Sequence, residues 1–348
     1  NAGVCVLEQN SLPGRATMKD VAEKAGVSTA TVSRALASPD KVSAIARMKV
    51  MQAISELGYA PDLLPRHQRR NDSQTLLILV PDICDPFFHE MIRGIEVTAA
   101  AEGYLALIGD CAHQDMQEVG FLDRILTRQI DGLLLLGSQV PPLQKLVHRD
   151  QLPPLVMANE FSADLEYPTV HIDNLTSAFN AVNYLLDSGL NRIACINGPD
   201  AISHCRYRRQ GYIQALQRQN ISINPHYLER GDFSFDSGAE ALIRLMKLPS
   251  PPEAIFCHND RMALGVLHQA EKMGIRVPQQ LSVIGFDDID AAQYSHPPLT
   301  TIAQPRFDIG REAATLLMEI IRGERVNGGS RLLEARLQVR QSTLIPAK

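Results

Sequence analysis

The chain has 348 residues, 45% of them apolar, and its 34 Lys and Arg against 39 Asp and Glu give a formal net charge of −5. This length predicts two or three globular domains and excludes collagenous and disordered classes. No apolar run approaches the ~20 residues of a membrane-spanning helix and no signal peptide pattern opens the sequence, so we expect a cytoplasmic protein. The six cysteines are scattered without a C-x-x-C pair, which predicts neither a disulfide framework nor a zinc site.

The charge is unevenly distributed along the chain. Residues 17–70 hold nine Lys or Arg and five Asp or Glu, a net charge of +4, which leaves −9 for all other residues. A basic segment on an acidic body is expected when one end of a protein meets an anionic polymer. Residues 1–16 have no periodicity, and we interpret them as a tail.

Residues 17–60 predict three short helices. Three hydroxyl residues are placed to cap them, namely Thr17, Ser28 and Ser43, and Gly26 and Gly58 would end the first and the third. We expect a small core made of Val21, Ala25, Val32, Leu36, Ile45 and Ile54. The turn between the first two helices is very short, which is typical of a helix-turn-helix.

The second helix has the side chains of a DNA-reading helix. A major groove accepts one helix, whose first turns reach the base edges. Arg34 can hydrogen-bond a guanine with two donors, Thr29 can contact a base and Ala30 can contact a thymine methyl group. Hydroxyl groups suit phosphate oxygens, and for this role we predict Ser28, Thr31, Ser33 and Ser43, together with Thr17 at the start of the first helix. A helical bundle in which Ser and Thr merely cap is the alternative.

Residues 61–74 are rich in Pro, Arg and polar side chains, which predicts a hinge or linker. Three arginines in it offer salt-dependent contacts to phosphates: Arg66, Arg69 and Arg70. This linker would join the helical headpiece to the rest of the chain.

Over residues 75–348, apolar runs of strand length alternate with helical segments, which predicts parallel sheets covered by helices on both faces. The segment is too long for one doubly wound sheet, so we expect an α/β core of two Rossmann-like lobes, divided near residues 159–163. The ligand site should lie in the cleft, beyond the carboxyl ends of the strands. Strands are expected at 75–80, 104–108, 132–136, 154–157, 169–172, 192–196, 254–257 and 281–284, and helices at 88–102, 115–128, 178–188, 207–219, 237–246, 260–273 and 308–322.

Several motifs spread over nearly the whole chain are specific in combination. They are VAEKAGVSTATVSRAL from Val21, KVS from Lys41, GYAP from Gly58, DPFF from Asp85, HNDRMALG from His258, IGFDD from Ile284 and PPLTTI from Pro297. In these motifs the chain resembles the LacI family of bacterial repressors. The resemblance implies a helix-turn-helix headpiece, a hinge, a periplasmic-binding-protein-like core that binds an effector and dimerises, and a cytoplasmic, nucleoid-associated regulator without a cofactor.

A second group of motifs is similar to nucleoside-responsive members of that family: VPDICDPFF from Val80, IGDCAH from Ile108 and HIDNL from His171. This resemblance implies a homodimeric repressor of nucleoside uptake and catabolism genes, relieved by cytidine and acting with the cyclic-AMP receptor protein on promoter DNA. A twofold dimer pairs two headpieces with a pseudo-palindromic operator. No heptad segment follows the strand-like residues 333–339, so we expect a dimer and not a tetramer.

Carried over by position, the effector-binding residues of the family fall on Phe87, Phe88, Asp173, Arg208, Phe233, Asn259 and Asp287. Their chemistry fits a nucleoside, because aromatic faces stack on a base while a carboxylate and a guanidinium hydrogen-bond ribose hydroxyls or base edges. Ordinary packing of the Phe pair, an Asx-turn at Asp287 and a surface ion pair of Arg208 are the alternatives.

The linker departs from the family pattern. In the family a short hinge helix inserts a Leu into the minor groove, and the corresponding position here is Gln68. An apolar wedge helps to unstack a base step, which Gln does less well. Pro65 also pushes Leu64 toward extended geometry. We therefore expect a hinge that folds poorly on DNA, a permissive half-site spacing and a need for a protein helper.

The sequence gives weaker signals for other functions, namely an enzyme, a metal-binding protein, a solute receptor and a regulator of another pathway. His89 and Glu90 begin like a zinc-protease helix, but Arg93 occupies the position of the second ligand, and no phosphate-loop, dinucleotide or nucleophile-elbow motif occurs. We therefore expect neither an enzyme nor a metal site, although the acidic residues at 287–290 have the chemistry of a cation site. A transporter's solute receptor shares the two-lobed fold, and a regulator of a sugar or purine pathway shares the whole architecture. The residues alone do not separate cytidine from other nucleosides.

Overall fold

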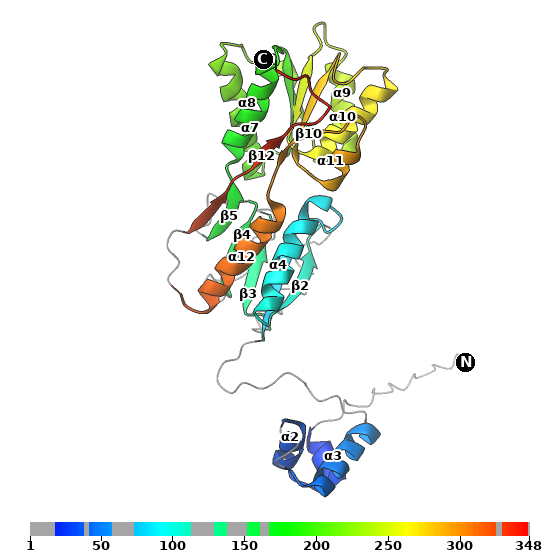
Figure 1. Cartoon of the computed structure of the whole chain (residues 1–348), viewed down its shortest axis with the longest axis vertical. Helices are drawn as coiled ribbons and strands as arrows, with labels where there is room; N and C mark the ends of the chain where they lie inside the picture. The colour runs from blue at the N-terminus through cyan, green and yellow to red at the C-terminus, as the bar shows by residue number, and fades with distance from the viewer. Residues whose placement is uncertain are drawn as a thin grey trace, which may run out of the picture. The chain divides into compact units, whose positions relative to one another are not determined.

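The computed structural model describes residues 18–37, 42–57, 73–112, 129–137, 152–160, 167–324 and 329–346 (Figure 1). The predicted tail, Thr17, residues 61–72 of the linker with Arg66 and Gln68, and the helix expected at 115–128 lie outside these residues. The chain divides into two compact units, residues 1–71 and 72–348. Each unit is described by itself below.

The described part of the first unit, residues 18–37 and 42–57, contains three helices: α1 (Met18–Ala25), α2 (Thr29–Ala37) and α3 (Ala44–Leu57). Gly26 follows α1 with a φ of +65°, a left-handed conformation that suits glycine at a helix end. The Ser28 hydroxyl accepts a hydrogen bond from the Thr31 amide at 3.2 Å and so caps α2. The buried core consists of Val21, Ala22, Ala25, Val32, Ala35, Val50 and Ala53. This is the helix-turn-helix that the sequence predicts.

The prediction that Ile45 belongs to this core is wrong. Its side chain is 67% exposed, as is that of Met48, because α3 turns Val50 and Ala53 toward the other two helices. Ile54, also predicted in the core, is partly buried. Apolar residues occur around most of the circumference of α3, so their spacing alone does not indicate which face is buried.

The second unit is built on two six-stranded sheets. The first is wholly parallel, in the order β11-β5-β4-β3-β1-β2. Its strands are β1 (Thr75–Val80), β2 (Leu105–Asp110), β3 (Gly132–Leu135), β4 (Leu155–Ala158), β5 (Thr169–Ile172) and β11 (Ser330–Leu333). Two helices pack together beside it, α4 (His89–Ala101) and α12 (Arg306–Ile321), as Figure 1 shows in cyan and orange. These elements form the first lobe.

The second sheet has the order β12-β10-β9-β8-β6-β7, and only β12 runs antiparallel to its neighbour. Its strands are β6 (Ile193–Asn197), β7 (Leu228–Arg230), β8 (Ala254–Cys257), β9 (Ser282–Asp287), β10 (Thr300–Ala303) and β12 (Arg336–Gln338). The helices are α7 (Asn174–Asp187), α8 (Ser203–Arg218), α9 (Phe235–Leu245), α10 (Asp260–Lys272) and the short α11 (Asp290–Tyr294). In Figure 1 the pair α7–α8 and the pair α9–α10 lie on opposite sides of this sheet. These elements form the second lobe, and together the two lobes confirm the predicted fold class.

The predicted division of the lobes near residues 159–163 is wrong. Strand β5 lies beyond that point and still pairs with β4 in the first sheet, so the chain first crosses between β5 and α7. It returns between β10 and α12, and crosses again between β11 and β12, which belong to different sheets. The prediction of one strand at residues 333–339 is wrong, because β11 ends at Leu333 and β12 begins at Arg336, and this third crossing lies between them. Each lobe is therefore assembled from segments that are distant in sequence.

Two glycines allow α4 and α12 to approach closely. A Cβ atom added to Gly310 would lie 2.0 Å from the Met91 carbonyl oxygen, and one on Gly94 would lie 2.1 Å from that of Phe307. Neither approach is possible for a residue with a side chain. Since α12 directly follows a crossing segment, this contact fixes the point from which the chain re-enters the first lobe. No helix within the described ranges is long and apolar enough to cross a membrane.

Candidate functional site

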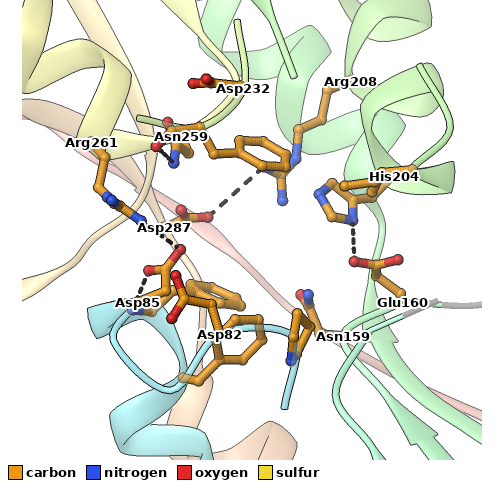
Figure 2. A pocket seen from close by; sticks show the side chains of 15 residues that line it. Asp82, Asp85, Asn159, Glu160, His204, Arg208, Asp232, Asn259, Arg261 and Asp287 are labelled. Atoms are coloured by element: carbon orange, nitrogen blue, oxygen red, sulfur yellow. Dashed lines mark hydrogen bonds and ion pairs between the residues drawn. The ribbon is translucent and has the colours of Figure 1, made fainter. Parts of the chain in front are cut away.

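A cavity of about 200 Å³ lies between the two lobes (Figure 2). Its walls come from the carboxyl ends of strands in both sheets, which is where open α/β folds bind ligands. The first lobe contributes Pro81, Asp82, Asp85, Phe87, Phe88, Asn159 and Glu160, and the second contributes Ile202, His204, Arg208, Asp232, Phe233, Asn259, Arg261 and Asp287.

Six of the seven predicted effector residues line this cavity. Asp173 does not line it. Its carboxylate caps α7 instead, accepting hydrogen bonds from the Thr176 amide at 2.9 Å and the Thr176 hydroxyl at 2.7 Å. An Asp ahead of a helix has this capping role so commonly that its spacing gives no separate signal for a ligand contact.

Aromatic surface enters the cavity from both lobes. Phe87 and Phe88 belong to the short helix η2 (Pro86–Phe88), which begins where Asp85 accepts a hydrogen bond from the Phe87 amide at 2.9 Å. Their rings meet edge to face, with centroids 5.1 Å apart. On the other lobe, Phe233 stacks on the His204 ring with centroids 6.0 Å apart. The cavity therefore offers aromatic faces to a flat ligand.

Arg208 is the most deeply buried charge at the site, with 2% of its surface exposed. Its Nε donates to Asn174 Oδ1 at 2.9 Å, Nη1 donates to the His258 carbonyl oxygen, and the guanidinium lies 3.6 Å from the centre of the Phe286 ring. The same Nη1 is 3.8 Å from Asp287 Oδ1. Because these contacts fix the orientation of the Arg208 guanidinium, it is pre-organised to hydrogen-bond a ligand.

Asp287 ends β9 with a φ of +120°, a conformation that side chains rarely adopt. Gln304 donates a hydrogen bond to its Oδ1 at 2.8 Å. Burial raises the pKa of this carboxyl to about 7, because desolvation outweighs the stabilising charge of Arg208 and the bond from Gln304. The strained backbone and the perturbed carboxyl are both common at functional sites.

A carboxylate and an imidazole meet across the cleft. Glu160 follows β4 in the first lobe, and His204 lies on α8 in the second. His204 Nδ1 and Glu160 Oε1 are 3.6 Å apart, and Figure 2 shows the two groups pointing toward one another. Burial, and then the nearby Arg208 and His258, lower the pKa of His204 well below its usual value. The ring is therefore neutral at pH 7.

Two further observations concern the metal-ligating and nucleophilic side chains among the described residues. No group of three or more His, Cys, Asp or Glu residues could hold a metal ion there. Cys195 Sγ does lie 3.5 Å from His258 Nε2, but both side chains are fully buried. Burial raises the pKa of the Cys195 thiol and lowers that of the His258 ring, which is the opposite of an activated nucleophile and its base.

In the helical unit, the side chains predicted to read bases lie on the outer surface of α2. Thr29, Ala30, Ser33 and Arg34 are exposed, as are Ser28 and Ser43 at the helix starts. Thr31 is half-buried, with its hydroxyl 2.9 Å from that of Ser28. Thr17, Gln68 and the linker arginines Arg66, Arg69 and Arg70 lie outside the described residues. Every other predicted DNA contact is described, and all but Thr31 are exposed.

Comparison with known proteins supports a DNA-binding unit followed by a ligand-binding unit. Residues 17–62 match the bacterial regulatory proteins of the lacI family, and residues 182–343 match a periplasmic binding protein-like domain. The chain is 59% identical over 328 residues to the HTH-type transcriptional repressor CytR of Escherichia coli K12, covering 94% of this chain and 96% of the relative. The chain belongs to the LacI family.

Two further relatives place the whole architecture in the LacI family. The ribose operon repressor of Escherichia coli K12 is 36% identical over 307 residues, which cover 88% of this chain and 93% of the relative. The solved cellobiose complex of the transcriptional regulator CelR has a TM-score of 0.71 at 30% identity and covers 94% of this chain and 100% of that one. The chain is thus a DNA-binding transcriptional repressor with the effector-domain fold of its family.

Beyond the positions carried over from the LacI family, the cavity contains charged residues that were not predicted from the sequence. Asp85 and Arg261 stand inside the quoted motifs DPFF and HNDRMALG, next to residues that were selected. Glu160 follows a strand at its carboxyl end, where ligands are expected. His204 precedes Arg208 by four residues on α8, so both lie on one helix face. Each residue thus had a positional signal in the sequence.

Proposed function

We propose that this repressor controls genes of nucleoside uptake and catabolism and that cytidine, bound in the cavity between the lobes, relieves repression. The observation that carries the proposal is the combination of aromatic faces from both lobes with the buried pair of Arg208 and Asp287. The 59% identity with a repressor named CytR supports it. Alternative effectors are a sugar or a purine.

The two parts of a nucleoside would make different contacts in the cavity, the base by stacking and the ribose by hydrogen bonds. Phe87, Phe88 and Phe233 offer faces to a base, where stacking contributes about 1–3 kcal/mol per base. Arg208 and Asp287 present a donor and an acceptor suited to the vicinal hydroxyls of ribose. Asn259 keeps its amide between the α10 cap and the Phe233 carbonyl oxygen, at 2.9 and 3.1 Å, and so fixes this wall.

Effector binding acts on DNA through the arrangement of the lobes. A ligand that contacts both lobes favours the arrangement in which both sets of contacts form, and it shifts the equilibrium only by its differential affinity. We propose a homodimer whose two headpieces bind a pseudo-palindromic operator through α2. In this proposal the cyclic-AMP receptor protein strengthens operator binding, and cytidine weakens the joint complex.

Calorimetry with a panel of cytidine, uridine, adenosine, ribose and hypoxanthine tests the effector. We expect heat with cytidine, and a gel shift on the promoters of nucleoside genes that weakens when cytidine is added in the presence of the cyclic-AMP receptor protein. Binding of ribose or hypoxanthine alone would make this a sugar or purine regulator. Binding of cytidine without any change in the gel shift would contradict relief of repression.

A further inference from the structure

The facing pair Glu160 and His204 has no role in the contacts assigned so far. Glu160 is 5% and His204 6% exposed, so both polar groups are almost removed from water. They come from different lobes, and both line the cavity (Figure 2). Since buried polar groups are nearly always hydrogen-bonded, the Nδ1 atom of His204, which has no such bond among the described residues, needs an explanation.

His204 Nδ1 is buried without a hydrogen-bond partner among the described residues. The 3.6 Å to Glu160 Oε1 is too long for a hydrogen bond between them. Nor is a direct ion pair favoured, because burial, and then the nearby Arg208 and His258, lower the pKa of His204 and so oppose a positive charge on the ring. The Phe233 ring, stacked on His204, keeps it in place from the side. The imidazole is therefore a fixed neutral group that faces an acidic side chain.

A neutral imidazole with its proton on Nδ1 is a donor, and an ionised carboxylate is an acceptor only. With Nδ1 and Oε1 3.6 Å apart, the two groups match a ligand edge that carries a donor next to an acceptor. The cytosine edge has this pattern, because its exocyclic amine donates and the adjacent ring nitrogen N3 accepts. In uracil the two are reversed, with a carbonyl oxygen next to an N–H group. Enzymes that bind single bases in pockets read this same edge while stacking the ring on aromatic side chains.

We propose that Glu160 and His204 select an amino-bearing nucleobase, with Glu160 accepting from the exocyclic amine and His204 Nδ1 donating to the neighbouring ring nitrogen. This inference rests on the proposed nucleoside response and adds the chemistry that distinguishes cytidine from uridine. His204 can exchange tautomers and accept from the N–H of uracil. Glu160 cannot donate to the carbonyl oxygen while it is ionised, so the carboxylate rejects uridine.

Calorimetry on the full-length protein tests the selection. We expect cytidine to bind at least about 100-fold more tightly than uridine, since a site built to hydrogen-bond a ligand group discriminates strongly against its absence. The ribosides of cytosine and of pyrimidin-2-one differ only in the exocyclic amine. We expect the second to bind about 10-fold more weakly than cytidine or worse. This comparison uses the unaltered protein, so folding of a variant does not enter.

Variants of Glu160 and of His204 test whether these two residues cause the preference for cytidine over uridine. In Glu160→Gln the amide can both donate and accept, so the preference for cytidine over uridine should fall below about 10-fold. In His204→Asn the side-chain amide keeps a donor near Nδ1, and most of the preference should remain, whereas His204→Phe should weaken cytidine binding. Asp200→Asn is the matched control, because this carboxylate is half exposed, pairs with Arg209 and does not line the cavity. It should retain the full preference.

The outcomes separate this inference from the proposed function. If no nucleoside binds, the nucleoside response itself is wrong. If cytidine binds but uridine or pyrimidin-2-one riboside binds equally well, the response stands and the selection by an amino edge is overturned. A Glu160→Gln protein that folds, as its circular dichroism melting curve shows, and that keeps the full preference would likewise overturn the role of Glu160.

Discussion

Arg261 on α10 and Asp85 at the start of η2 form an ion pair across the cleft, with Nη1 and Oδ2 3.2 Å apart. Both side chains are mostly buried, and the guanidinium lies 5.3 Å from the centre of the Phe235 ring. A second arginine also spans the lobes, since Arg306 donates to the Asp288 carbonyl oxygen at 2.8 Å and to that of Pro86 at 3.4 Å. The two lobes are thus held together by protein contacts at the cavity.

Breaking the ion pair of Arg261 and Asp85 should weaken ligand binding through the arrangement of the lobes. This effect does not require either side chain to contact the polar groups of the ligand. The pair forms only when the lobes are close, so Arg261→Ala makes the lobe arrangement seen here less favourable. A partly exposed ion pair contributes about 0.5–1 kcal/mol, so we expect cytidine affinity by calorimetry to fall about 2- to 6-fold. In Asp85→Asn the cap on η2 remains, because an amide oxygen still accepts from the Phe87 amide.

A double-mutant cycle isolates the contribution of the pair. The combined protein Asp85→Asn, Arg261→Ala should lose little more affinity than either single variant, since each change already breaks the contact. Fully additive losses would show that the two side chains act separately on the ligand.

The buried Arg208 should be essential for the stability of the core. Arg208→Ala removes the charge that faces Asp287 and the donor to the Asn174 amide oxygen, and breaking a buried pair costs about 3–5 kcal/mol of unfolding free energy. Urea unfolding followed by circular dichroism measures this loss. The neighbouring Arg209→Ala is the matched control, because its pair with Asp200 is largely exposed and contributes about 0–1 kcal/mol. Equal losses in the two variants would contradict the assigned role of Arg208.

The sequence predicts the kinds of side chain at the site better than it predicts which residues line it. Phe87, Arg208 and Asp287 are predicted because the effector positions of the LacI family fall on them, and all three line the cavity. Asp173 has the same kind of position but caps α7, because a carboxylate ahead of a helix can bond either the helix amides or a ligand. Only the direction of the side chain decides between the two, and no residue pattern specifies it.

The assignment of strands to the two sheets could not be predicted from the sequence either. The strand and helix periodicities located β1, β5 and β8 to the residue, yet they do not state which sheet a strand joins. The three crossings depend on long-range contacts such as that of α12 with α4, where Gly94 and Gly310 allow two backbones to touch. Glu160 and His204 meet only because those crossings bring the lobes together, so pairing them from the sequence was not possible.

The contact between α4 and α12 gives a prediction about stability. In Gly310→Ala the new methyl group would meet the Met91 carbonyl oxygen, so the helices must separate, and overpacking of this kind costs about 1–3 kcal/mol. The unfolding free energy in urea should fall by that amount. Gly329→Ala is the control, since a Cβ there meets nothing within 4 Å. A Gly310→Ala protein as stable as the control would show that the helices do not pack as closely as described.

The stability of the core should also depend on pH through Asp287. Its folded pKa of about 7 lies above the ordinary 3.8, so its contribution to stability is greatest at low pH and is lost as the pH rises toward 7. His204 and His258 act in the opposite sense, because their lowered pKa values make the folded state lose stability as the pH falls below 6.5. The wild-type curve contains both effects.

Asp287→Asn separates the two effects. This variant has no carboxyl to ionise, so its stability relative to the wild type should rise between pH 5 and pH 7, by about 1–3 kcal/mol. Urea unfolding at both pH values measures the difference. A relative stability that does not change over this range would mean that the folded pKa of Asp287 lies well below 7.

The last prediction concerns operator recognition. Arg34 is exposed on α2, in the second turn of the helix that we propose enters the major groove. If it bonds a guanine, Arg34→Ala should weaken operator binding by about 1–3 kcal/mol and leave binding to unrelated DNA nearly unchanged. Gel shifts on both DNAs at one salt concentration measure the ratio. Lys49→Ala, which removes an exposed charge from α3, controls for the loss of one positive charge. A loss of the same size on both DNAs would make Arg34 a phosphate contact, because phosphate contacts carry no sequence information.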